Sequence, residues 1–175
     1  MLGLFRTHRV EPSYYGGSTV NGGSTAVPVN DGLKTEPISL GDGVIGQVKH
    51  FCLHPESTTQ DQHDALYAQL CGMARNASGF EDDFALYAGG VYYADKRMIK
   101  RAKRSLEKRL SDETTLAALP DKQRCKVLEG ILDCINIGER MAVNGTWLRE
   151  YASRILPIIT DEQILDYARR LYINW

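Results

Sequence analysis

Apolar residues recur at intervals of three and four through most of the chain after residue 54. This is the spacing with which an α-helix buries one face, so it predicts helices. The stretches that show it, or that carry helix start and stop signals, are residues 58–75, 80–91, 95–110, 111–120, 127–138, 146–157 and 160–171. Short connections join them. We therefore expect a mainly α fold, a bundle of five to seven helices.

Residues 44–53 show a different pattern, in which β-branched and aromatic residues alternate loosely with polar ones. Val44, Val48 and Phe51 belong to this alternation. Such a pattern is typical of a strand, so the sequence predicts one short strand-like segment ahead of the helices.

Residues 1–42 differ in composition from everything that follows. A GGST tetrapeptide occurs twice, at residues 16–19 and 22–25, among prolines and further glycines. This predicts an extended Gly/Ser-rich N-terminal arm over residues 1–42, followed by a helical body over residues 43–175. The arm has too few large apolar side chains to fold by itself. We expect a neighbouring subunit to hold it, with a groove on the chain's own body as the other interpretation.

No stretch approaches eighteen consecutive apolar residues, so the sequence predicts no transmembrane helix and no membrane partner. The first residues also lack the charge order and the apolar length of a signal peptide. The expected location is the cytoplasm or the interior of a virus particle, without secretion through a signal peptide.

Charge is distributed unevenly along the chain. The formal net charge is −1, yet eight of the sixteen residues from 95 to 110 are Lys or Arg and only two are acidic. This segment carries +6 and the rest of the chain −7. A concentrated positive surface attracts carboxylate or phosphate partners whatever the net charge of the whole chain.

On a helical wheel, the apolar residues of the 95–110 segment fall within an arc of about 120°, the width of a core-facing stripe. They are Met98, Ile99, Ala102, Leu106 and Leu110. Arg109 lies at the edge of that arc. The remaining cations gather on the opposite side and are the predicted partner- or phosphate-binding residues: Lys96, Arg97, Lys100, Arg101, Lys103, Arg104 and Lys108.

Three interpretations of this cationic side remain open. It can be a solvated surface that the chain's own carboxylates neutralise, for example those of residues 81–83. It can meet an acidic protein surface, including that of a sister subunit. It can also track the phosphates of a nucleic acid, although no aromatic residue is interleaved with the cations for base stacking.

Other combinations of residues give weaker indications of chemistry. Cys52, His54, His63 and Cys71 have zinc-ligand chemistry but match no common zinc-site spacing. No nucleophile turn accompanies a cysteine and histidine, and the glycine tract lacks the Lys of a phosphate-binding loop. We predict no catalytic residue, no metal and no cofactor, and expect the four cysteines to be free thiols.

These observations favour a non-enzymatic structural, assembly or adaptor subunit, similar in architecture to helical virion or phage-particle proteins that carry a long arm. The expected partners are other protein subunits, in a homo-oligomer or a larger assembly. The alternative is a small nucleic-acid-binding or regulatory helical protein that uses residues 95–110.

Overall fold

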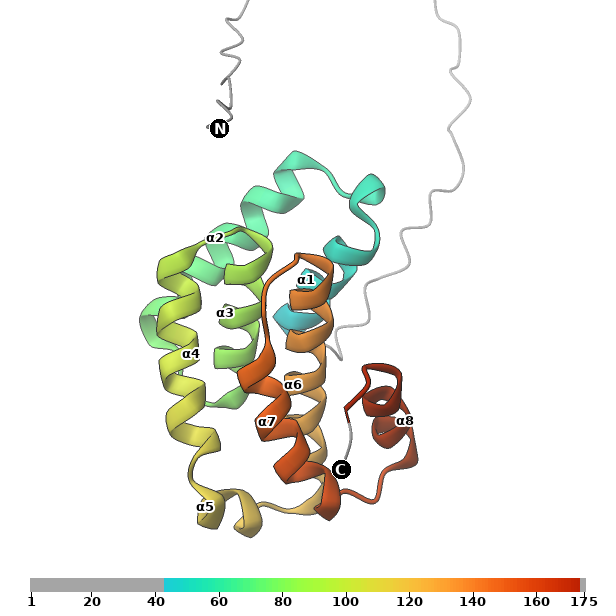
Figure 1. Ribbon diagram of the computed structural model, residues 1–175. Helices are drawn as coiled ribbons and strands as arrows, with labels where there is room; N and C mark the ends of the chain where they lie inside the picture. The colour runs from blue at the N-terminus through green and yellow to red at the C-terminus, as the bar shows by residue number, and fades with distance from the viewer. Residues whose placement is uncertain (1–42, 174–175) are drawn as a thin grey trace, which may run out of the picture. The chain divides into compact units, whose positions relative to one another are not determined.

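The computed structural model describes residues 43–173, which are mainly helical (Figure 1). Within this range the chain forms two 3₁₀ turns and eight α-helices and contains no strand. The helices are α1 (Gly43–Leu53), α2 (Gln60–Asn76), α3 (Phe80–Tyr92), α4 (Lys96–Leu110), α5 (Glu113–Ala118), α6 (Asp121–Arg140), α7 (Thr146–Ile155) and α8 (Glu162–Arg170). The turns are η1 (Pro55–Ser57) and η2 (Leu156–Ile158).

The predicted arm, residues 1–42, lies outside the described residues. Its extended conformation and its contacts therefore stay predictions. Of residues 43–173 no helix combines the length and the apolar character that crossing a membrane requires.

The prediction of a strand over residues 44–53 was wrong, because these residues form α1. Helix α1 brings the number of α-helices among residues 43–173 to eight, one above the predicted upper bound of seven. Val48 and Phe51 are buried, and Val44 and Ile45 pack against the core. These positions are three to four residues apart, so they share one helical face that packs on α3 and α6. Burial of that face outweighed the β-propensity of the individual residues.

Helices α3 and α6 form the centre of the bundle. Helix α3 packs against α1, α2, α4 and α6, and every residue from Asp83 to Val91 is buried. Helix α6 packs against α1, α3, α7 and α8 and buries ten of its residues. The other helices surround this pair, and α4 lies at the left edge of the body in Figure 1.

Glycines allow the central helices to approach their neighbours closely. Helix α3 continues through Gly89 and Gly90 to Tyr92. A Cβ at Gly89 would lie 2.4 Å from a methyl carbon of Leu70, and one at Gly90 would lie 2.9 Å from the backbone nitrogen of Ile99. These two glycines therefore set how closely α2 and α4 pack on α3.

Substitution of Gly90 by Ala is expected to lower the free energy of unfolding by about 1–2 kcal/mol, because α4 must move away from the new methyl group. Gly72 in α2 is the matched control, since it is exposed and a Cβ there meets nothing within 4 Å. Gly72→Ala is expected to raise the unfolding free energy by about 0.5–1 kcal/mol through helix propensity alone. Urea unfolding measures both values, and equal gains would contradict the close contact.

Two buried carboxylates connect outer helices to the central pair. Asp83 of α3 accepts hydrogen bonds from Ser105 and Arg109 of α4. Asp133 of α6 accepts from Lys49 of α1 and Tyr167 of α8, each at 2.8 Å. Paired in this way, the two charges fix the positions of α1, α4 and α8.

Candidate functional site: the cationic face of α4

The apolar side of α4 is buried as the sequence predicted. Ala102, Leu106 and Leu110 are at most 1 % exposed, and Met98 is also buried. Ile99 is only partly buried, although it packs against the core beside Gly90. One side of α4 is thus occupied by its contacts with the rest of the bundle.

The N-terminus of α4 is held by Asp95. Its Oδ1 accepts hydrogen bonds from the backbone N–H groups of Arg97 and Met98, and its Oδ2 accepts one from the hydroxyl of Tyr67 on α2. The Met98 N–H, followed by the Tyr67 hydroxyl, lowers the pKa of Asp95, so the cap stays ionised. A negative charge at this end also complements the helix dipole.

Arg109 anchors the other end of α4. Its Nε lies 2.9 Å from Oδ2 of Asp83, whose side chain is 3 % exposed, and Ser105 Oγ donates to the same oxygen over 2.6 Å. The guanidinium also lies over the Phe80 ring, 6.0 Å from its centroid. Arg109 therefore belongs to the α3–α4 contact, which explains its position at the apolar edge of the wheel.

Six of the seven predicted binding residues are exposed, and we call them the α4 cationic face: Lys96, Arg97, Lys100, Arg101, Arg104 and Lys108. Among the described residues, no carboxylate comes within 4.0 Å of the charged nitrogens of these six side chains. Their positive charges are therefore not neutralised by ion pairs from the helical body.

Lys103, the seventh predicted residue, is partly exposed and contacts other side chains of this chain. Its Nζ lies 3.7 Å from a carboxylate oxygen of Glu107 and 5.3 Å from the centroid of the Trp147 ring on α7. Trp147 in turn packs edge-on against Tyr87 and Tyr151. Lys103 thus marks the border between the cationic face and α7.

The carboxylates expected to neutralise this surface point elsewhere. Asp83 binds Arg109, Glu81 pairs with Lys126 of α6 at 3.5 Å, and Asp82 accepts from the backbone N–H of Ser78. The interpretation of a self-neutralised surface thus finds no support from residues 81–83.

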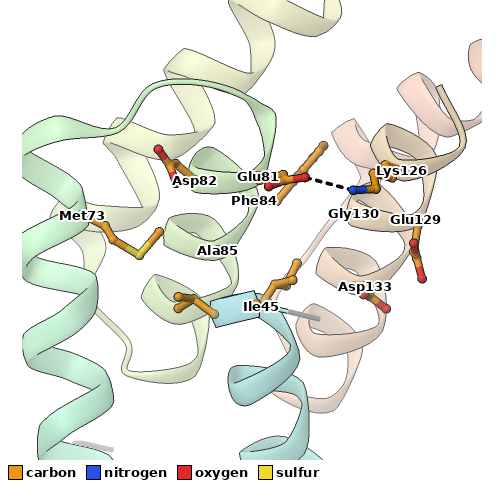
Figure 2. A pocket seen from close by; sticks show the side chains of 12 residues that line it. Ile45, Met73, Glu81, Asp82, Phe84, Ala85, Lys126, Glu129, Gly130 and Asp133 are labelled. Carbon is orange, nitrogen blue, oxygen red and sulfur yellow. Dashed lines mark ion pairs between the residues drawn. The ribbon is translucent and has the colours of Figure 1, made fainter. Parts of the chain in front are cut away.

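A pocket of about 410 Å³ lies between α1, α2, α3 and α6 and has no lining residue from α4 (Figure 2). Its apolar lining includes Ile45, Met73 and Phe84. The Glu81–Lys126 ion pair crosses one side of it, and Asp133, further along α6, is bonded to Lys49 and Tyr167. In this pocket the contacts of Glu81, Lys126 and Asp133 join one helix to another. The sequence pattern did not indicate this pocket, because it depends on four segments meeting in space.

The four residues with zinc-ligand chemistry have other surroundings. His63 Nε2 lies 2.9 Å from the Thr58 hydroxyl, and its ring stacks on that of Tyr92. In the part of the chain that the structure describes, no three His, Cys, Asp or Glu side chains are grouped so that they could hold a metal ion.

All four cysteines are free thiols, as expected. Burial raises the pKa of Cys52, Cys125 and Cys134, most strongly for the fully buried Cys134. These three thiols therefore stay protonated near neutral pH and are weak nucleophiles.

Comparison of the chain with protein-family models, curated proteins and solved structures finds no match in any of the three.

Proposed function

We propose that this chain is a non-enzymatic assembly or adaptor subunit that docks onto an acidic surface of a partner protein through the α4 cationic face. The observation that carries the proposal is a set of six exposed cations that form no ion pair with any residue from 43 to 173. They lie on a helix anchored by Asp95 at one end and by Arg109 at the other. Such a helix holds the backbone positions of the six cations in a fixed pattern before a partner arrives, so no backbone entropy is lost there on binding.

The electrostatic cost of the face also favours a partner. Like charges four residues apart, such as Lys96 and Lys100 or Lys100 and Arg104, each destabilise a helix by about 0.2–0.5 kcal/mol. Opposite charges brought by a partner would remove that repulsion and add roughly 0.2–1 kcal/mol for each exposed pair.

An acidic protein surface fits the face better than a nucleic acid does. Trp147, the aromatic side chain in contact with Lys103, is partly buried against Tyr87 and Tyr151, which leaves less of its ring for base stacking. The chain outside residues 95–110 carries −7, so phosphates beyond α4 would meet net negative charge. The nucleic-acid alternative is therefore the outcome against which the proposal is tested.

Replacement of Lys100, Arg101 and Arg104 by Glu is expected to weaken the binding of poly-glutamate by about 2 kcal/mol, or roughly thirtyfold. Fluorescence anisotropy of labelled poly-glutamate at several salt concentrations measures this loss. The control triple variant changes Arg75, Lys122 and Arg154, three exposed cations outside α4, to Glu and shifts the net charge equally.

The control variant is expected to bind poly-glutamate nearly as the natural chain does. Equal losses in both triple variants would show a net-charge effect and would contradict docking through α4. Tighter binding of duplex DNA, with a log–log salt slope near −0.9 for each contacted phosphate, would favour the nucleic-acid alternative.

The arm completes the proposal, since an assembly subunit needs a second contact that holds neighbouring chains together. We expect removal of residues 1–42 to abolish higher-order assembly, while circular dichroism still shows the helices of the body. Sedimentation velocity measures the assembly state. Normal assembly of the truncated chain would remove the arm from the proposal and leave the α4 cationic face as the interaction surface.

A further inference from the structure

Four of the six residues in the α4 cationic face form one row. Lys96, Lys100, Arg104 and Lys108 follow one another at intervals of four residues. A helix rises about 1.5 Å per residue, so their Cα positions are about 6 Å apart along the axis and the row is about 18 Å long. Arg97 and Arg101 begin a second, parallel row at the same interval.

The shape of the face limits what can pack on it. The pocket between α1, α2, α3 and α6 has no lining residue from α4, and the six side chains of the face are exposed on the convex outer side of the helix. No strand edge occurs among residues 43–173 to pair with an extended peptide. A second helix fits such a surface, because its side-chain ridges can pack between the rows of α4.

From this geometry we infer that the partner presents an acidic α-helix whose Asp or Glu residues repeat every four positions. Such a helix has the same 6 Å interval, so successive carboxylates face successive cations. Pairing relieves the like-charge repulsion within both rows. The inference rests on the proposed function and adds the secondary structure and the charge spacing of the partner.

Two blocked peptides of about 20 residues, long enough to form isolated helices, test the spacing. Both have the same Ala/Gln background and four Glu residues. In the first peptide Glu recurs every fourth position and forms one row. In the second it recurs every fifth position, so successive carboxylates are turned by about 140° around the helix. Circular dichroism establishes that the two peptides have equal helicity.

Anisotropy of the labelled peptides gives their dissociation constants for the full chain. The first peptide is expected to bind at least about tenfold more tightly than the second. Lys100→Glu/Arg104→Glu is expected to weaken the first peptide about tenfold or more. The control Arg75→Glu/Lys122→Glu, which changes the net charge equally at exposed sites on α2 and α6, is expected to leave it nearly unchanged.

Trp147 reports where binding occurs. The chain has two tryptophans, so Trp175→Phe leaves Trp147 as the only one. Because Lys103 lies over the Trp147 ring at the border of the face, a helix on the row should change the Trp147 emission. A bound first peptide that leaves this emission unchanged would contradict binding at the α4 row.

The outcomes separate the inference from the function on which it rests. Equal binding of both peptides, lost in the α4 variant, would overturn the four-residue spacing and keep docking to an acidic surface. Binding of poly-glutamate without either peptide would do the same. Failure of all three acidic probes, or tighter binding of duplex DNA, would overturn both.

Discussion

Replacement of Arg109 by Met is expected to lower the free energy of unfolding by about 3 kcal/mol, far more than a change at any cation of the α4 cationic face. The Asp83 side chain is 3 % exposed and would lose its charged partner, while Ser105 would remain its one side-chain donor among residues 43–173. Removing one member of a buried ion pair costs about 3–5 kcal/mol, because the other charge stays buried without compensation. The partial exposure of Arg109 places our value at the lower end.

Urea unfolding measures this loss, and Lys108→Met is the matched control. Lys108 is the neighbouring residue, is exposed and forms no ion pair with a described residue, so its replacement should change stability by less than about 0.5 kcal/mol. The double variant Asp83→Asn/Arg109→Met should be more stable than Arg109→Met alone, since it removes the uncompensated charge. Similar losses for Arg109→Met and Lys108→Met would show that the pair does not anchor α4.

Alkaline pH is expected to lower the free energy of unfolding, because tyrosine phenols with a raised pKa must lose their protons. Burial raises the pKa of Tyr87, Tyr92 and Tyr167 and raises that of Tyr93 to about 12. A hydrogen bond to the Asp95 carboxylate raises the pKa of Tyr67 to about 12.

The direction of the effect follows from proton binding in the two states. Above about pH 10 the unfolded chain loses its phenolic protons while the folded chain keeps them. The stability that these groups contribute is therefore complete below pH 10 and is lost as the pH rises towards the folded-state values. A single tyrosine such as Tyr167 contributes up to about 1.4 kcal/mol of loss per pH unit in this range.

Thermal unfolding at intervals from pH 8 to pH 11.5 checks this expectation. Tyr167→Phe lowers stability at every pH because the hydrogen bond to Asp133 is lost, but it should also reduce the slope above pH 10. Tyr172→Phe is the control, since Tyr172 is 88 % exposed and should leave the slope unchanged. An unfolding temperature that stays constant up to pH 11.5 would contradict the role of these phenols.

Local periodicity was enough to predict most of the helices and the orientation of α4. The residues of its buried side, from Met98 to Leu110, are separated by three and four positions, so the pattern itself contains the helix and its inner face. The same approach failed at residues 44–53. Val44, Val48 and Phe51 have high β-propensity, which favoured the prediction of a strand. Their spacing of four and three residues is nevertheless that of one helical face.

Contacts between distant segments could not be predicted in this way. The wheel placed Arg109 at the apolar edge, but its partner Asp83 lies 26 residues earlier in the chain and no local pattern indicates it. Likewise, nothing in residues 95–110 indicates that Lys103 lies over Trp147, because that contact exists only once α7 packs beside α4. The identity of such partners depends on tertiary packing rather than on local pattern.

The turn between α3 and α4 has a consequence for insertions and deletions. The backbone N–H of Asp95 donates to the carbonyl of Gly90, Ala94 adopts a left-handed φ of 55°, and the Asp95 side chain caps α4. Asp95 thus bonds to the end of α3 through its backbone and caps the start of α4 through its side chain. With a residue inserted between Ala94 and Asp95, a single residue could no longer both donate to the Gly90 carbonyl and cap α4. We therefore expect natural variants to keep the length of this turn.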